Sequence, residues 1–350
     1  MNAMLAPAPQ LEVRRRLPAD DAAWDQFARA HPDGTFFHLS AWAGVIERAF
    51  GHRSHYLLAR RGVSIEGVLP LVHVKSLLFG NALISIPFGV YGGVIAASAA
   101  ASRALIEAAC ALARDLGVGY LELRNREPSD LDWPSRDLYA TFRKSLAPTE
   151  EANLLAIPRK QRAMVRKGIE AGLTAEIDGG TERLYAAYSE SVRNLGTPVF
   201  GQRYFRELRR AFGDDCEVLT VLRQGEAVAS VMNFYFRDEV LPYYGGGTAA
   251  ARDCKANDFM YWEVMRRACS RGLRIFDYGR SKCDTGSFAF KEHWGFAPAP
   301  LHYQYYLVRT RELPNVSPNN PKYRMLIRAW RHLPLPISRA VGPLLARSLG

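Results

Sequence analysis

The sequence predicts a mixed α/β (α+β) protein made of two similar domains. The first observation is an internal repeat, in which the run Arg-Ala-Phe-Gly at 48–51 returns at 210–213, a shift of 162 residues. The second is that helix-like and strand-like patterns follow in the same order around both copies. The third is a length of 350 residues with 48% hydrophobic content, enough for two ordinary cores. Because solenoid repeats are much shorter, each copy should fold as a domain.

Each copy should contain amphipathic helices, an apolar strand hairpin around a glycine turn, a third strand ending in Tyr-Gly-Gly, another helix and a last strand. The hairpin turns carry Gly62 and Gly225, and the apolar patterns that follow them span 65–72 and 228–236. A glycine ends the later helix of each copy, as is common at helix C-termini. The expected helices are 22–30, 40–50 and 101–116 in the first copy and 181–194, 202–212 and 257–271 in the second.

Residues 148–158 have the composition of a linker, with a proline at each end. We therefore expect a domain boundary near residue 150. The expected organisation is a first domain at 11–150, a second domain at 151–310 that carries the active site, and a tail at 311–350.

The tail is basic and amphipathic. It has no Asp or Glu from Leu313 onward but six cations, and Tyr323, Ile327 and Trp330 share one face of an expected helix. The Leu-Pro-Leu-Pro run at 333–336 ends that helix before a second apolar, basic segment. The pattern fits two interpretations: a peripheral contact of 321–349 with an anionic membrane, or a tail docked on the second domain.

Composition narrows the class of protein. The five cysteines form no C-x-x-C pair, and their odd number argues against a disulfide framework, so a reducing cytoplasm is expected. No export signal, bilayer-spanning run, metal-ligand set, Walker A loop or G-x-G-x-x-G fingerprint occurs in the sequence, so we expect no metal cofactor. The net charge of +11 indicates an anionic partner, for which we do not expect DNA.

A cluster of cations follows Pro158, a residue common at the first position of a helix. In the expected helix Arg159, Arg162 and Arg166 share a face, and Lys160 and Lys167 add further charge. Such a row suits phosphates, as in a nucleotide, a pyrophosphate lipid, coenzyme A or RNA, better than a single carboxylate. The alternative is a solvated charged face.

Three further motifs carry polar groups that suit a binding site. Tyr244, Gly245 and Gly246 end a strand with backbone amides that could cradle phosphate or acyl oxygens, although the glycines could equally serve a turn. Asn233 is a polar residue in an apolar strand, which indicates an inward hydrogen-bonding role or an exposed edge.

The third motif runs from Asp277 to Lys291. It comprises Asp277, Arg280 and Ser281 at the end of a strand, then Gly286 and Lys291 among aromatic residues. A partly desolvated lysine here could meet a carbonyl or phosphate of a substrate, or could pack as a structural residue. The first copy has no equivalent of this segment.

Together, the Asp-Tyr-Gly-Arg-Ser run at 277–281, Gly286, the Phe-Lys pair at 290–291 and the basic run at 158–167 resemble the FemAB-like family over roughly residues 20 to 310. The resemblance implies two tandem GNAT-like domains and transfer of an acyl or aminoacyl group from acyl-CoA or aminoacyl-tRNA to an amine. It puts Lys291 near the acyl donor, with Arg280, Ser281 and Gly286 on the adjoining loop and the basic helix facing phosphates. The general base is unassigned, with Asp277 and Asp284 as candidates.

The tail, with prolines at 334, 336 and 343, resembles the subgroup associated with exosortase and PEP-CTERM exopolysaccharide systems. That resemblance implies an acceptor that is a cell-envelope or exopolysaccharide precursor. If the tail contacts a membrane, a lipid-linked acceptor follows. One alternative is a non-catalytic module of the same fold that binds an anionic polymer or a membrane-associated partner. Another is an RNA-binding protein, which ranks last because the sequence shows no platform of stacked aromatic residues.

Overall fold

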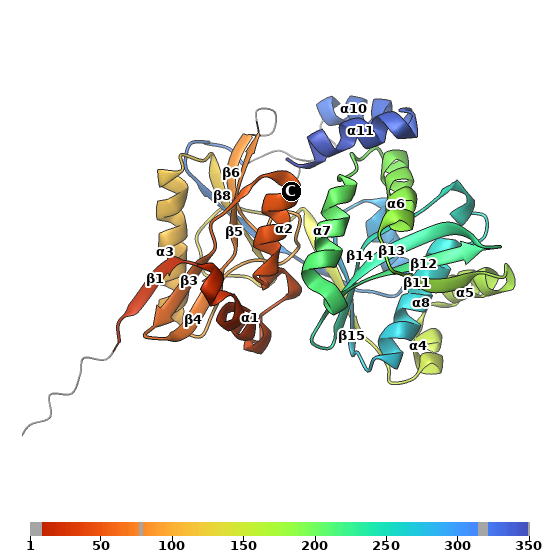
Figure 1. The fold of residues 1–350 in the computed structure, drawn as a ribbon, viewed down its shortest axis with the longest axis horizontal. Helices are drawn as coiled ribbons and strands as arrows, with labels where there is room; N and C mark the ends of the chain where they lie inside the picture. Colours follow the sequence, from red (N-terminus) through yellow and green to blue (C-terminus); the bar gives the residue numbers. More distant parts are fainter. Residues whose placement is uncertain (1–8, 77–79, 314–320, 349–350) are drawn as a thin grey trace, which may run out of the picture. The chain divides into compact units, whose positions relative to one another are not determined.

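The computed structural model describes residues 9–76, 80–313 and 321–348 (Figure 1). The chain forms two compact units, and each is described by itself. The first comprises residues 1–47, 51–135 and 302–313, and the second comprises 48–50, 136–301 and 314–350. Both units therefore contain segments from distant parts of the sequence.

The first unit contains two sheets, one of four strands in the order β1-β3-β4-β7 and one of six in the order β2-β5-β6-β8-β17-β9. Pro70 separates β4 from β5 at the point where the chain passes from one sheet to the other, because proline supplies no N–H for a ladder. Helix α3 covers a core that includes Leu69, Leu105 and Leu121. The elements are β1 (Leu11–Arg15), α1 (Asp21–Ala30), α2 (Ala41–Phe50), β2 (Arg53–Ser54), β3 (Leu57–Arg61), β4 (Ser64–Leu69), β5 (Leu71–Ser76), β6 (Gly80–Ser85), β7 (Ile95–Ala96), α3 (Ala99–Asp115), β8 (Tyr120–Asn125), β9 (Ser135–Arg136) and β17 (His302–Leu307).

The second unit contains one sheet of seven strands in the order β11-β12-β13-β14-β15-β10-β16. Helix α6 packs on one face of β14 and helix α8 on the other, since Gly246 lies against α6 while the alternate residues Gly245 and Gly247 lie against α8 and the segment before it. The elements are β10 (Tyr139–Ser145), α4 (Glu150–Ala156), α5 (Arg159–Glu170), β11 (Thr174–Asp178), α6 (Glu182–Leu195), α7 (Gln202–Phe212), β12 (Cys216–Arg223), β13 (Glu226–Phe236), β14 (Glu239–Gly247), α8 (Ala256–Ser270), β15 (Ile275–Lys282), α9 (Gly286–His293), β16 (Pro298–Pro300), α10 (Pro321–Arg331) and α11 (Leu335–Ala346).

The helices agree with the repeat pattern to within about two residues at each end, and 202–212 agrees at both. Two expectations were wrong. Residues 148–158 are no plain linker, because Thr149 caps helix α4 by accepting a hydrogen bond from the Ala152 amide. The third strand of the first copy, β6, ends at Ser85, well before the Tyr-Gly-Gly of 91–93.

The units divide the chain differently from the expected boundary at residue 150. Strand β10, from the expected first domain, lies beside β15 in the second unit. Strand β17, from the expected second domain, pairs along its whole length with β8 in the first unit. A change in composition indicates where a linker lies, but it does not indicate which sheet a strand joins. In this chain, strand pairing determines the unit to which β10 and β17 belong.

The tail forms helices α10 and α11, both of which contact α6 of the second unit. The break expected at 333–336 separates them. In the part of the chain that the structure describes, no helix is both long enough and apolar enough to cross a bilayer.

Candidate active site

Strands β14 and β15 of the second unit run parallel and then part. They pair at Glu239 with Ile275 and at Val240 with Phe276, but β14 continues to Gly247 and β15 to Lys282. A register shift between β13 and β14 lies just beyond the last pair, where Met232 faces Tyr244 and Asn233 faces Pro242. This bulge leaves Tyr243 as the extra residue and bends β14 where the strands separate. Every second amide of β14 past the bulge points away from β13 and toward the separation.

The first unit has the same parallel pair but no such separation. Strand β6 pairs with β8 from Ala82 to Ile84 and ends one residue later. The chain beyond β6 then bonds back to β8, because the amides of Gly92 and Gly93 both donate to the Arg124 carbonyl. The buried Arg124 guanidinium donates in turn to the carbonyl of Gly89 at 2.9 Å and to the Glu122 carboxylate at 2.7 Å. In the first copy, therefore, the loop after β6 bonds to β8 beyond the parallel pair, whereas in the second copy β14 and β15 continue past their last paired residues.

Strand β15 carries a second bulge, which two predicted site residues hold in shape. Arg143 of β10 faces Asp277 and Thr141 faces Arg280, so one residue of β10 stands opposite Tyr278 and Gly279. Gly279 has a φ of +63°, the left-handed conformation that glycine adopts readily. The buried Asp277 carboxylate accepts a hydrogen bond from the Gly279 amide at 2.7 Å and so fixes this turn of the backbone.

Lys291 secures the bulge from the other side. Its Nζ donates to the carbonyl oxygens of Tyr278 at 2.8 Å, Gly279 at 3.0 Å and Arg280 at 3.1 Å. Three acceptors match the three N–H donors of an ammonium group. Burial lowers the pKa of Lys291 to about 7, opposed by the Asp277 carboxylate, which favours the charged form. The side chain thus holds the backbone that positions Arg280 and Ser281, and its catalytic role stays a prediction.

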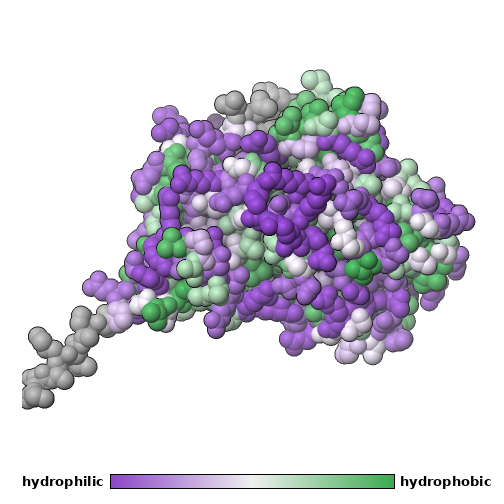
Figure 2. All heavy atoms as spheres, in the orientation of Figure 1, coloured by the Kyte–Doolittle hydropathy of each residue, from purple (hydrophilic) through white to green (hydrophobic). Residues whose placement is uncertain are grey.

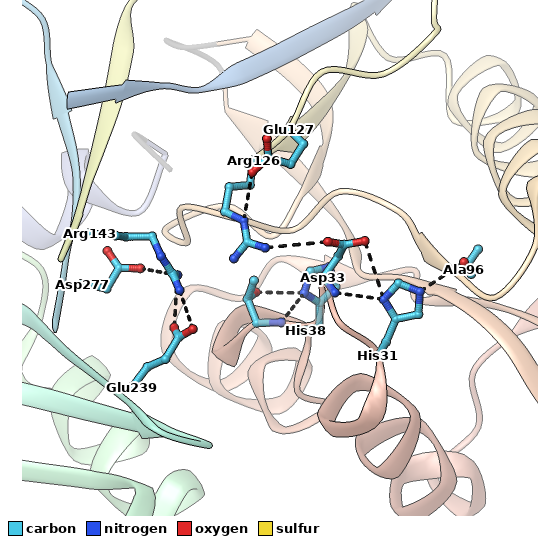
Figure 3. A network of polar contacts seen from close by, with 10 residues as sticks. His31, Asp33, His38, Ala96, Arg126, Glu127, Arg143, Glu239 and Asp277 are labelled. Carbon is cyan, nitrogen blue, oxygen red and sulfur yellow. Dashed lines mark hydrogen bonds and ion pairs between the residues drawn. The ribbon is translucent and has the colours of Figure 1, made fainter. Parts of the chain in front are cut away.

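Asp277 is an ion-pair partner as well. Arg143 Nη1 donates to Asp277 Oδ2 at 3.0 Å, and the same guanidinium spans the Glu239 carboxylate with contacts of 3.1 and 2.5 Å (Figure 3). Glu239 is the first residue of β14, and Asp277 lies on β15. Arg143 therefore links the two strands where they begin to separate. With Arg143 and the Gly279 amide bonded to it, Asp277 is built into the sheet, and its candidacy as general base stays a prediction.

Comparisons with known proteins relate this chain to acetyltransferase domains and to solved structures of similar fold. Residues 156–292 match the family model described as an acetyltransferase (GNAT) domain, a stretch that contains β14, α8, β15 and Lys291. The chain is similar to the structure of FemX, with a TM-score of 0.64 and 14% identity over 90% of this chain and 100% of that one. The chain has a tandem GNAT-like fold. This confirms the predicted fold class.

The chain is similar to two more solved structures. A tandem GNAT protein from the clavulanic acid biosynthesis pathway has a TM-score of 0.55 and 14% identity, over 87% of this chain and 100% of that chain. L-PGS from Bacillus licheniformis has a TM-score of 0.54 and 12% identity, over 89% of this chain and 96% of that chain. A search of curated protein sequences found no significant match.

The glycines of β14 have a packing role in the second GNAT-like domain. A Cβ atom on Gly246 would lie 2.6 Å from Ser191 Cβ and 3.0 Å from the Tyr188 backbone, so the glycine lets α6 approach the strand. On Gly245 it would meet Val231, Met260 and the Tyr261 hydroxyl at 3.2–3.4 Å, which is tight but close to ordinary contact. Tyr244 points to the α6 face, where its hydroxyl bonds that of Tyr204 at 2.8 Å. The structure therefore supports the packing interpretation of Gly246 and leaves an acyl-binding role of the β14 amides as a prediction.

Several buried polar groups of the second GNAT-like domain have no hydrogen-bond partner in the described part of the chain, and three of them lie on β13 and β15. They are the Tyr278 hydroxyl, the Ser281 hydroxyl and both polar atoms of the Asn233 side chain. Asn233 is fully buried opposite the β14 bulge, so it does not lie at an exposed edge, and its expected hydrogen-bonding role stays a prediction. Burial raises the pKa of Tyr278 far above its usual value, so its hydroxyl stays protonated and can donate a hydrogen bond. The sequence analysis did not include Tyr278 among the site residues, because its aromatic neighbours are typical of a hydrophobic core.

The basic helix α5 presents most of its charge to solvent. Gln161, Val165 and Gly168 face the protein, with Gly168 tight against Phe259 of α8. The cations Arg159, Lys160, Arg166 and Lys167 are exposed on the other side, and no ion pair joins them to an acidic residue in the described part of the chain. Arg162 departs from the expected row, since it is half-buried and donates to the Leu155 carbonyl at 3.1 Å.

The remaining predicted residues lie near the β15 bulge. Arg280 stacks over the Tyr139 ring, and Gly286 is the exposed first residue of α9, the helix that carries Lys291. The structure thus brings Asp277, Arg280, Ser281, Gly286 and Lys291 together. Asn233 and Tyr244 lie on β13 and β14, and the cations stand apart on α5.

The first GNAT-like domain has its own polar network, around His38 (Figure 3). His38 Nδ1 accepts from the Thr35 amide, and Nε2 lies 2.9 Å from the Gly93 carbonyl. Burial lowers the pKa of His38 to about 4, so the ring is neutral near pH 7 and serves as a structural link. Among the described residues of the whole chain, no group of three or more His, Cys, Asp or Glu side chains is arranged to hold a metal ion.

Proposed function

We propose that the second GNAT-like domain is an N-acyltransferase whose acyl donor binds where β14 and β15 part. The single observation that carries this is the separation of the two strands past Val240 and Phe276, within the stretch that matches the acetyltransferase model. The equivalent position of the first domain is closed by Arg124. The second domain is therefore the candidate for the chemistry.

The reaction is direct transfer. The acceptor amine attacks the acyl carbon, a C–N bond forms, the C–S bond of a thioester or the C–O bond of an ester breaks, and the amine loses one proton to a base or water. Backbone amides of β14 that point away from β13 are suited to stabilise the developing oxyanion. The protonated Tyr278 hydroxyl, buried without a partner beside the bulge, is suited to donate a hydrogen bond to the substrate or to the leaving group, which takes its proton from water.

The donor carries phosphates in this proposal, as both acyl-CoA and aminoacyl-tRNA do. Its support is the exposed cationic face of α5, made of Arg159, Lys160, Arg166 and Lys167. An outward face fits a large polyanion that lies across the surface, or the phosphate-bearing end of a donor whose acyl group reaches the strands. The matched family description favours an acyl-CoA donor.

The acceptor class rests on the sequence resemblance to the FemAB-like family. We propose an amine of a cell-envelope or exopolysaccharide precursor, in the setting of an exosortase and PEP-CTERM system. The FemX likeness supports the fold that such an enzyme would need.

The test is donor binding by the full-length protein, measured by native mass spectrometry and thermal shift with acetyl-CoA, longer acyl-CoAs and aminoacyl-tRNA. One donor should stabilise the protein saturably. Gly245→Ala, which places a methyl group between β14 and Tyr261, should weaken that donor at least tenfold. Gly179→Ala is the matched control, because a Cβ there meets nothing within 4 Å.

Two results would overturn the proposal. One is that no donor binds, while an anionic polymer does, which would favour a non-catalytic module. The other is a donor that binds Gly245→Ala as tightly as the wild type, which would put the acyl group somewhere other than the strand separation.

A further inference from the structure

The C-terminal helices are built into the second GNAT-like domain by one face. In α11 the residues that face the protein are small, namely Ser338, Gly342 and Ala346, at helical spacing. A Cβ on Gly342 would lie 3.0 Å from the backbone of Val199, so the helix approaches closely. Arg339 Nε donates to Ser189 Oγ of α6 at 2.8 Å, which fixes the rotation of α11 about its axis.

Helix α10 is held at the C-terminal end of α6. Gly196 ends α6 with a φ of +82°, and a Cβ there would lie 2.5 Å from Ile327 Cγ2. The Arg193 guanidinium donates to the Leu333 carbonyl at 3.2 Å in the turn between the two helices. These contacts define which side of the α10–α11 pair faces the protein and therefore which side faces away.

The opposite side of the pair is apolar and exposed. Met325 is 73% exposed and Leu326 is 62% exposed on α10. On α11 the exposed residues Ile337, Val341 and Leu344 follow i, i+4, i+7 spacing, which gathers them in one stripe. Figure 2 shows this patch in green at the top of the molecule, over the place where Figure 1 draws α10 and α11. Surface positions of soluble proteins rarely gather so many large apolar side chains without a partner.

Positive charge accompanies the apolar stripe. Residues 313–350 contain no Asp or Glu. Arg328 and Arg331 are exposed on α10, the helix that carries Met325 and Leu326. An apolar stripe with cations around it matches an anionic bilayer surface, where apolar side chains enter the acyl boundary and arginines meet phosphates. A second copy of the chain is a poorer match, since a symmetric contact would set these cations against themselves.

We propose that the outward face of α10 and α11 binds a bilayer that contains anionic lipid, which places the second domain at a membrane surface. This inference stands independently of the proposed acyl transfer. It combines the two interpretations of the tail, docking on the second domain and contact with a membrane, because one face of the helices packs on the domain and the other face binds lipid.

The test is co-sedimentation of the full-length protein with vesicles of phosphatidylcholine alone and with vesicles that also contain phosphatidylglycerol. The wild type should bind the anionic vesicles, and binding should fall as salt is raised. The triple variant Met325→Ser, Leu326→Ser, Leu344→Ser should lose binding at least tenfold. Arg328→Gln should weaken binding about fivefold, the equivalent of the ~1 kcal/mol expected for one cation near an anionic surface.

The matched controls change equally exposed residues elsewhere. Val63→Ser, Leu155→Ser and Ile169→Ser together remove three exposed apolar side chains, and Arg223→Gln removes one exposed cation. Circular dichroism and melting temperature establish that every variant folds. Failure of the wild type to bind anionic vesicles would overturn the proposal, as would equal losses in the controls. A change of oligomeric state in the triple variant without any vesicle binding would instead assign the face to self-association.

Discussion

Replacing Lys291 with methionine separates its structural role from a catalytic one. The substitution keeps most of the apolar stem but removes three hydrogen bonds to carbonyls of the β15 bulge. At a pH between 7 and 10.5 the folded amine is neutral and has two N–H donors, so with about 1 kcal/mol for each net hydrogen bond the second unit should lose roughly 2 kcal/mol of unfolding free energy. For a unit of this size the melting temperature should fall by roughly 4 to 8 °C.

The pH dependence of stability gives a second readout. Burial lowers the pKa of Lys291 from 10.5 to about 7, so between these values the unfolded chain binds a proton that the folded chain does not. The contribution of Lys291 to the free energy of unfolding therefore decreases as pH falls from 10.5 toward 7, and it increases as pH rises from 7 toward 10.5. Urea unfolding of the wild type and of Lys291→Met at several pH values should show that the variant lacks this component.

Lys75→Met is the matched control, because Lys75 is an exposed lysine on β5 of the first unit. It should leave both the melting temperature and the pH profile unchanged. The reasoning would be refuted if Lys291→Met melted within about 1 °C of the wild type yet lost acyl transfer, since the ammonium would then act on the reaction rather than on the fold.

Three other perturbations test the packing around the candidate site and in the first unit. Arg143→Met leaves the Asp277 carboxylate buried without its cation, and urea unfolding should show a loss of about 3 kcal/mol; a loss below about 1 kcal/mol would mean that the pair matters little. Gly246→Ala should destabilise the second unit by about 1–3 kcal/mol, because the methyl group meets Ser191 and the Tyr188 backbone, whereas Gly179→Ala should melt like the wild type. The stability of the first unit should fall as pH drops from 6.5 toward 4, because burial lowers the pKa of His38 to about 4 and the unfolded histidine takes up its proton first; a His38 ring that titrates near 6.5 by NMR would contradict this.

Much of the fold could be predicted from local patterns. The helices at 202–212 and 257–271 were found because hydrophobic spacing and a closing glycine depend on nearby residues alone. The strand exchange was not found, since nothing in the residues of β10 or β17 specifies which distant strand each will join. Pairing partners are set by the completed sheets, and a linear pattern carries little information about them.

The site was only partly predictable for a similar reason. The sequence identified the segment from Asp277 to Lys291, because its glycines and charges differ from the first copy. It could not show that Lys291 faces three backbone carbonyls rather than a substrate. That distinction depends on a bulge with Gly279 in a left-handed conformation, which becomes visible only with the strand register.

The late position of β17 has a consequence for how the protein is made. The first sheet receives this strand from residues 302–307, so a ribosome must complete nearly the whole second unit before the first can close. Until then the edge of β8 is open to incorrect pairing. Neither half of the gene could be expressed alone by a cut near residue 150, since each product would lack a strand that the other encodes. The two copies of the repeat must therefore be synthesised as one chain for both sheets to be completed.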